Sequence, residues 1–214
     1  MRIKDLINII NTYDVKIIYD RPEEVMGAIM EGSSPLYFSP VEGKERKKFE
    51  NVKDKHKFTS TTASIHIIDI SIEELISIFE CDASGIHEFT NNIIKPYCSE
   101  EIDKKIVYVT FLFLHEVGHW HKKKKMDKNV FAFIEKDNEL RKENLIKVFD
   151  LNRQRRERIA KGSRYNLTVK EKRLLEQYMN EYRNIPKEKE ADEFAKSQMS
   201  ASLRRYKDSR LLES

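Results

Sequence analysis

The sequence contains only two cysteines, Cys81 and Cys98, and they lack the short spacing of a metal-binding cysteine pair. Two such thiols also cannot supply the disulfide framework of a small secreted domain, so we expect both to be unpaired in a reducing compartment. The first residues of the chain lack the apolar core of a secretory signal. These absences predict a cytoplasmic protein in which a metal would be held by residues other than cysteine.

Long hydrophobic runs are absent as well. No window reaches the roughly 18 apolar residues that a membrane-spanning helix needs, so we expect no membrane segment. The 214 residues include 39% hydrophobic residues, enough for the core of one domain, and 36% charged residues, which predict a surface dense in lysine and glutamate. We therefore expect residues 1–214 to form a single domain.

An apolar stretch, residues 107–114, leads directly into the pattern His115-Glu116-x-x-His119. On a helix, His115 and His119 are one turn apart and face the same side, so both imidazoles can bind one zinc ion. Glu116 lies about 100° further round the helix. A carboxylate there can hold a metal-bound water and act as a general base without being a ligand.

The alternative interpretation of this motif is two helix histidines whose rings are simply hydrogen-bonded, because a short pattern can arise by chance. The context favours a metal. A helix that is apolar on nearly all sides is buried, and buried imidazoles and carboxylates need a partner. Gly118 costs about 1 kcal/mol relative to alanine inside a helix, and we expect it to let a neighbouring element approach closely.

A second helix, expected over residues 185–205, has two acids on its apolar face. The apolar side chains that lie on the same side as Glu188 are Ala191, Phe194, Ala195, Met199 and Leu203. Asp192 shares this face at about 40° from Glu188, whereas Glu190 and Glu193 point away. Carboxylates on a buried face are costly unless a cation or a donor meets them.

We therefore predict Glu188 as the third metal ligand. Asp192, one turn further along, is expected to accept the outer N–H of a ligand histidine and fix its tautomer. The alternative is that acids in a first turn only complement the helix dipole. That explanation accounts for Glu188 and Glu190 but does not explain why Asp192 shares the buried face.

The region before residue 100 should contain a small β-sheet and short helices. Residues 71–74, Ser-Ile-Glu-Glu, form a capping-box pattern, and Ser99 is expected to cap the active-site helix over residues 100–121. We expect the strand at 64–70 to hold an extended substrate backbone. The predicted strands, recognised by their β-branched and aromatic residues, are 15–19, 36–38 and 64–70.

Residues 122–184 form a basic segment between the two metal-binding helices. From 121 to 185 there are 19 Lys or Arg against 10 Asp or Glu. We expect helices at about 127–160 and 168–183, the second opened by a capping box at Thr168 and Glu171. The charge fits a solvated helical face, and the alternative is a surface for nucleic acid or an acidic partner. No base-reading motif is visible, so support for nucleic acid is weak.

The two motifs together resemble the gluzincin metallopeptidases. The sequence Glu-Lys-Glu-Ala-Asp-Glu-Phe-Ala of residues 188–195 is similar in particular to the ImmA/IrrE family of cytosolic bacterial and phage-related peptidases. The match covers two helices, about 30 residues. It implies a zinc site of His115, His119 and Glu188 with Glu116 as the base. It also implies a mostly helical α+β, zincin-like fold with a small N-terminal sheet.

The chain departs from that family in two places. The gap between the two helices is longer than is usual there, and Phe-Leu-Phe-Leu stands where the family tends to have Phe-Thr-x-Ala. The long basic insertion is expected to cover the cleft or to recruit a partner. A metzincin is excluded, because the positions of its glycine and third histidine hold Lys122 and Lys125.

These observations predict a zinc-dependent endopeptidase acting on a protein or peptide. Helix-turn-helix repressors, the known substrates of the ImmA/IrrE family, are the candidate substrates. Candidates for the donor that stabilises the oxyanion are Tyr165, Tyr178, Tyr182 and His121. The alternative function is a non-catalytic regulator with structural zinc, whose basic helices bind a partner or DNA. A closed four-ligand site would favour the regulator, and an open fourth position the enzyme.

Overall fold

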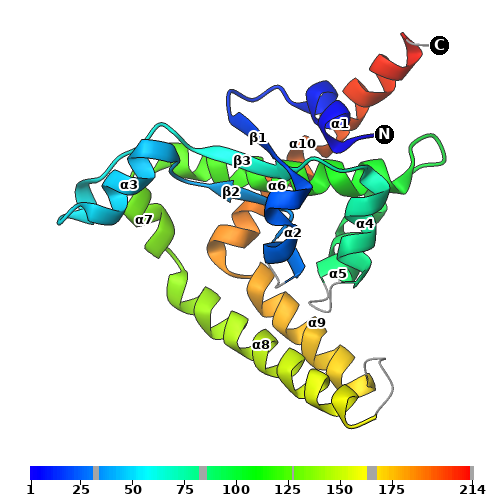
Figure 1. Ribbon diagram of the computed structural model, residues 1–214. Helices are drawn as coiled ribbons and strands as arrows, with labels where there is room; N and C mark the ends of the chain where they lie inside the picture. Colours follow the sequence, from blue (N-terminus) through cyan, green and yellow to red (C-terminus); the bar gives the residue numbers. More distant parts are fainter. Residues whose placement is uncertain (31–33, 82–85, 127, 163–167, 213–214) are drawn as a thin grey trace.

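The computed structural model describes residues 1–30, 34–81, 86–126, 128–162 and 168–212, and Figure 1 shows a mostly helical chain around a small sheet. This arrangement confirms the predicted α+β class. The elements in chain order are α1 (Ile3–Ile10), β1 (Lys16–Asp20), α2 (Pro22–Met30), β2 (Leu36–Ser39), α3 (Gly43–Asn51), η1 (Lys55–Lys57), β3 (Ser64–Ile68), α4 (Ile72–Cys81), α5 (Ile86–Ile94), η2 (Lys95–Tyr97), α6 (Lys104–Lys125), α7 (Val130–Glu135), α8 (Asn138–Ala160), α9 (Val169–Arg183) and α10 (Pro186–Leu211).

The sheet has the strand order β1-β3-β2, with β1 parallel and β2 antiparallel to β3. Both edges of β3 are therefore paired within the sheet, and its backbone cannot hold a substrate. Our expectation that residues 64–70 bind the substrate is wrong. The edge strand that packs beside α6 is β2. The order depends on pairings between distant segments, which the pattern of a single strand does not encode.

Helix α6 forms the centre of the core, with nearly every residue from Ile106 to His119 buried. Its N-cap is Asp103, whose carboxylate accepts a hydrogen bond from the Lys105 N–H at 2.8 Å. The expected cap, Ser99, instead lies in a turn bridged to Ile102. The side chain of an N-cap residue accepts a hydrogen bond from the backbone N–H two or three residues later. Asp103 has this position relative to the start of α6, whereas Ser99 is too far from it. No helix in the described part of the chain is both long and apolar enough to cross a bilayer.

Helix α10 packs against α6 and is the main packing partner of that helix. Four of the five apolar residues expected on its buried face are buried, namely Ala191, Ala195, Met199 and Leu203, whereas Phe194 is half-buried. Gly118 of α6 faces Ala191, which confirms that the glycine admits a close neighbour. Because the ligand-bearing parts of both helices lie at this contact, their packing positions the site.

The basic segment is helical, as expected, and α8 and α9 form an antiparallel hairpin that projects from the rest of the molecule in Figure 1. The capping box of Thr168 and Glu171 is present. The single helix predicted over 127–160 is instead divided into α7 and α8. The break occurs at Asp137, which has a left-handed φ of 63° and whose carboxylate accepts the Lys187 N–H of α10 at 3.0 Å. Aspartate tolerates this conformation, so a local side-chain contact replaces helix continuation.

Candidate metal centre

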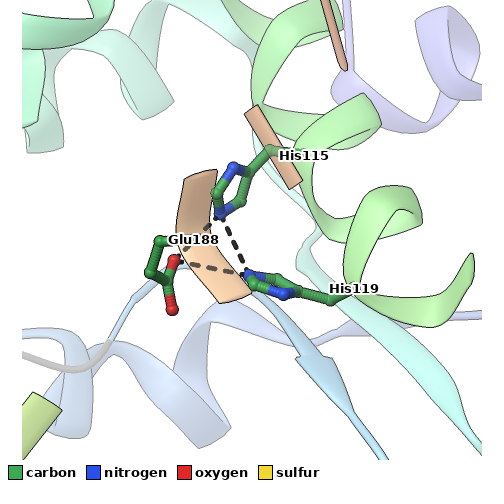
Figure 2. A group of neighbouring side chains, drawn as sticks. All are labelled: His115, His119 and Glu188. Carbon is green, nitrogen blue, oxygen red and sulfur yellow. Dashed lines mark hydrogen bonds and ion pairs between the residues drawn. The ribbon is translucent and has the colours of Figure 1, made fainter. Parts of the chain in front are cut away.

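Three buried side chains meet between α6 and α10, as Figure 2 shows. Their facing atoms form a small triangle. The Nε2 atoms of His115 and His119 are 3.1 Å apart. Oε2 of Glu188 lies 3.3 Å from the first and 3.4 Å from the second. The structure therefore brings together the three residues predicted as ligands, and Glu188 is only 2% exposed.

The spacing of the triangle fits a metal ion. Tetrahedral bonds of about 2.0–2.1 Å place neighbouring ligand atoms about 3.3–3.4 Å apart, close to the three distances observed. The other oxygen of Glu188, Oε1, has no hydrogen-bond partner and lies 3.5 Å from Nε of Arg141. The geometry and the donor types show a site that could bind a metal ion.

Asp192 fixes the orientation of one ligand histidine. Its Oδ1 lies 2.8 Å from Nδ1 of His115 and accepts a second hydrogen bond from Nη1 of Arg183 at 2.9 Å. All three side chains are buried. Because Nδ1–H of His115 donates to Asp192, the Nε2 atom faces the triangle. This is the outer-sphere contact predicted for Asp192, and Arg183 neutralises the carboxylate in turn.

Without a metal, the site holds a proton. Burial and the nearby Arg183 lower the pKa of His115, but its hydrogen bonds to Asp192 and Glu188 outweigh them and raise that pKa to about 9. Burial raises the pKa of Glu188, but His119 and His115 outweigh burial and hold that pKa well below its usual value. An imidazolium therefore pairs with a carboxylate in the core. A metal ion would have to displace the proton on His115.

Glu116 lies outside the triangle and faces the edge strand. Its Oε2 accepts a hydrogen bond from the backbone N–H of Phe38 in β2 at 2.8 Å. The side chain is half-buried and lines the same cavity as the three candidate ligands. The carboxylate predicted as the general base is thus held by β2 in the same cavity as the three candidate ligands.

The cavity has a volume of about 200 Å³. Strand β2 and helix α6 line part of the cavity, and the basic segment lines another part. That segment contributes one residue from α7, one from α8 and two from α9, namely Phe133, Arg141, Tyr182 and Arg183. The insertion therefore shapes the site itself and is more than a solvated appendage.

Three cations of this cavity, Arg141, Arg183 and Lys187, were not anticipated from the sequence. Nε of Arg141 lies 3.5 Å from Oε1 of Glu188. The ammonium of Lys187 donates to the Phe133 carbonyl at 3.1 Å and lies over the ring of Phe133, and burial lowers its pKa to about 8. Arg141 belongs to a strongly polar helix without an apolar stripe, so no sequence pattern distinguishes it. Lys187 precedes a candidate ligand, and this adjacency was its only signal.

The structure distinguishes among the candidate oxyanion donors. Tyr182 lines the cavity, and burial raises the pKa of its hydroxyl. Tyr178, one turn earlier, packs under Lys147 and does not line the cavity, so its predicted role is not supported. Tyr165 lies outside the described residues. The ring of His121 packs against Phe194, and His121 is neither a cavity residue nor a fourth ligand within the described part of the chain.

Helix packing, buried donors and a neighbouring carboxylate together define a candidate metal centre that borders a cavity. The closed four-ligand site that would favour a purely structural metal is not formed by the described residues. No family model, no curated protein and no solved structure matches this chain.

Proposed function

We propose that this protein is a zinc-dependent endopeptidase that cleaves a protein substrate. The observation that carries the proposal is the triangle of His115, His119 and Glu188, with edges of 3.1, 3.3 and 3.4 Å, open to a cavity that Glu116 also lines. Two imidazoles and one carboxylate with an open fourth position are the ligand set of catalytic zinc in peptidases. Bound zinc supplies a water of lowered pKa and polarises the scissile carbonyl.

Glu116 acts as the general base. The Phe38 N–H holds one of its oxygens, so the carboxylate keeps a fixed orientation toward the cavity. It accepts a proton from the attacking water and later delivers that proton to the leaving amine. The same hydrogen bond ties the base to β2, whose free edge is suited to pairing with an extended peptide backbone.

Tyr182 and Arg141 supply donors for the oxyanion that develops on the substrate. Both line the cavity, and burial raises the pKa of the Tyr182 hydroxyl, which keeps it protonated. Preorganised donors in a site shielded from water stabilise developing negative charge. The substrate class implied by the resemblance to the ImmA/IrrE family is a helix-turn-helix repressor.

The decisive experiment measures bound zinc in the wild type, Glu188→Ala and Glu190→Ala. Glu190 is the matched control because it lies on the same helix but pairs with Lys122 and Lys136 on the surface. We expect zinc to be lost only from Glu188→Ala. Zinc loss from Glu190→Ala with retention in Glu188→Ala would contradict the ligand assignment.

Catalysis is tested with Glu116→Gln, in which the amide oxygen can still accept the Phe38 N–H. We expect this variant to retain zinc and to lose cleavage of an unfolded protein substrate such as casein, or of a helix-turn-helix repressor. Cleavage that persists at the wild-type rate would remove Glu116 from the mechanism. A zinc-loaded wild type that cleaves neither substrate would favour a regulatory role.

A further inference from the structure

Two segments far apart in the sequence are joined at the C-terminal end of α6. Thr59 forms a β-bridge with Asn129, the Val130 N–H donates to the Phe58 carbonyl at 3.1 Å, and the Ser60 N–H donates to the Lys128 carbonyl at 3.1 Å. Figure 1 shows α3 and α7 at the same end of the molecule. We call this end, residues 43–60, 122–126 and 128–131, the basic lobe.

The basic lobe concentrates positive charge from both segments. Residues 43–57 contain seven Lys or Arg against three Asp or Glu, and residues 122–128 contain five Lys against one Asp. Seven of the lysines are exposed and form no ion pair with a described carboxylate. They are Lys44, Lys47, Lys48, Lys53, Lys124, Lys125 and Lys128.

On α3 the three lysines share one face, because positions 44, 47 and 48 follow the i, i+3, i+4 spacing. The acids of the helix do not neutralise this face. Glu45 accepts hydrogen bonds from Ser60 and Thr62, and Glu50 pairs with Arg46. The face of α3 that carries Lys44, Lys47 and Lys48 therefore keeps its positive charge.

The end of α6 is organised in the same way. Lys123 is buried and donates to the Ser60 carbonyl at 2.6 Å, and Lys122 pairs with Glu190. The remaining lysines of this turn, Lys124 and Lys125, point outward with Lys128 after them. Lys122 and Lys123 thus attach this turn to the rest of the molecule. The three outward lysines form no ion pair with a carboxylate among the described residues.

The α8–α9 hairpin has a smaller excess of positive charge than the basic lobe. Residues 138–183 contain 13 Lys or Arg against 7 Asp or Glu, whereas residues 43–60 and 122–131 contain 12 against 4. Several cations of the hairpin are paired internally, with Lys147 bound to Glu181, Arg158 to Glu171 and Arg153 to Asp150. Others, such as Lys161, Lys170 and Lys172, are exposed and form no ion pair with a described carboxylate.

The chemistry of the lobe fits a phosphate backbone better than a protein. The large exposed apolar residues in the described part of the chain lie elsewhere, on β2, α8, α9 and the termini. Protein interfaces depend on apolar or aromatic anchors, whereas sequence-independent nucleic-acid binding depends on lysines and arginines that neutralise phosphates. We propose that the basic lobe is a sequence-independent nucleic-acid-binding surface, in which the lysines of α3 and those at the end of α6 contact one phosphate backbone.

The experiment measures fluorescence anisotropy of a labelled random-sequence DNA duplex, and of a single strand of equal length, at several salt concentrations. The variants are Lys44→Gln/Lys47→Gln/Lys48→Gln and Lys124→Gln/Lys125→Gln/Lys128→Gln. A matched triple on the hairpin, Lys161→Gln/Lys170→Gln/Lys172→Gln, removes the same charge from exposed lysines. Circular dichroism and bound zinc verify that each variant is folded.

We expect each lobe triple to weaken binding by about ten-fold or more at low salt and to reduce the slope of log K against log salt by up to about 3. The hairpin triple should change both quantities little. A preference for duplex or single strand identifies the form of nucleic acid that the surface takes. The proposal is overturned if neither form binds, if the hairpin triple weakens binding as much as the lobe triples, or if polyglutamate of equal charge binds as tightly as DNA.

Discussion

Gly118 and Ala191 are in backbone contact at the crossing of α6 and α10. A Cβ atom on Gly118 would lie 2.8 Å from Cα and 3.0 Å from the carbonyl oxygen of Ala191. Neither is a side-chain atom that could rotate away. The contact lies three residues after Glu188 on α10 and one residue before His119 on α6, so the helix separation that it permits also sets the ligand distances.

We expect Gly118→Ala to force the two helices apart and to weaken metal binding. Overpacking typically costs about 1–3 kcal/mol, which outweighs the gain of about 1 kcal/mol in helix propensity. The measurements are zinc affinity and the free energy of unfolding. Gly27→Ala in α2 is the control, because a Cβ there meets nothing within 4 Å, and it should leave zinc affinity unchanged. Equal zinc affinity in the two variants would contradict the role given to the contact.

Asp192→Asn should reduce zinc affinity by about 10- to 100-fold, the usual effect of losing a carboxylate behind a ligand histidine. It should also destabilise the metal-free protein, because Arg183 would keep its buried charge without a carboxylate. Competition titration against a chelator measures the first effect, and urea unfolding the second. The neighbouring exposed acid Glu193 provides a control, and Glu193→Gln should alter neither quantity.

The metal-free protein should lose stability as the pH rises from about 6.5 to 9. The folded-state pKa of His115 is about 9, above the unfolded value near 6.5, so its contribution is complete below 6.5 and disappears through 9. The loss should amount to at most about 3 kcal/mol. Urea unfolding of wild type and His115→Asn, both metal-free, isolates this contribution by difference. Zinc-loaded wild type should not show the loss, because the metal has replaced the proton on His115. If the zinc-loaded and metal-free wild type lost stability in parallel as the pH rises, the assignment of this loss to His115 would be refuted.

Tyr182→Phe should lower kcat for peptide cleavage by about 10²- to 10³-fold while zinc remains bound, as expected when one donor to an oxyanion is lost. Tyr178→Phe removes the same hydroxyl one turn away, outside the cavity, and should retain wild-type kcat. Steady-state kinetics with a fluorogenic peptide separate kcat from KM. An equal loss of kcat in the two variants would contradict the role of the Tyr182 hydroxyl in stabilising the oxyanion.

The parts of this structure that could be predicted are those encoded by short-range periodicity. Two histidines one turn apart share a face whatever surrounds them, and Glu188 was recognisable because a helical wheel places it among apolar residues. The three strands were likewise visible from β-branched and aromatic residues. Each of these inferences needs only the geometry of a single element.

Features that depend on distant contacts were not predictable. The position of β2 at the edge beside α6 follows from pairing across the sheet, and Arg141 reaches Glu188 only because α8 folds back over the cavity. The break at Asp137 is similar, because its carboxylate is occupied by an amide 50 residues further along the chain. No local pattern specifies such partners, so the residues around the metal ligands were harder to identify than the ligands themselves.

The contact between Asp137 and the first turn of α10 has a consequence for how this protein can be shortened. The segment from α7 to α9 looks removable, since it intervenes between two motifs that would suffice for a minimal zinc site. Yet it supplies the acceptor for the Lys187 N–H and four residues of the cavity lining. Excising it would free the start of the helix that bears Glu188, so deletion of the insertion should disrupt the candidate metal centre.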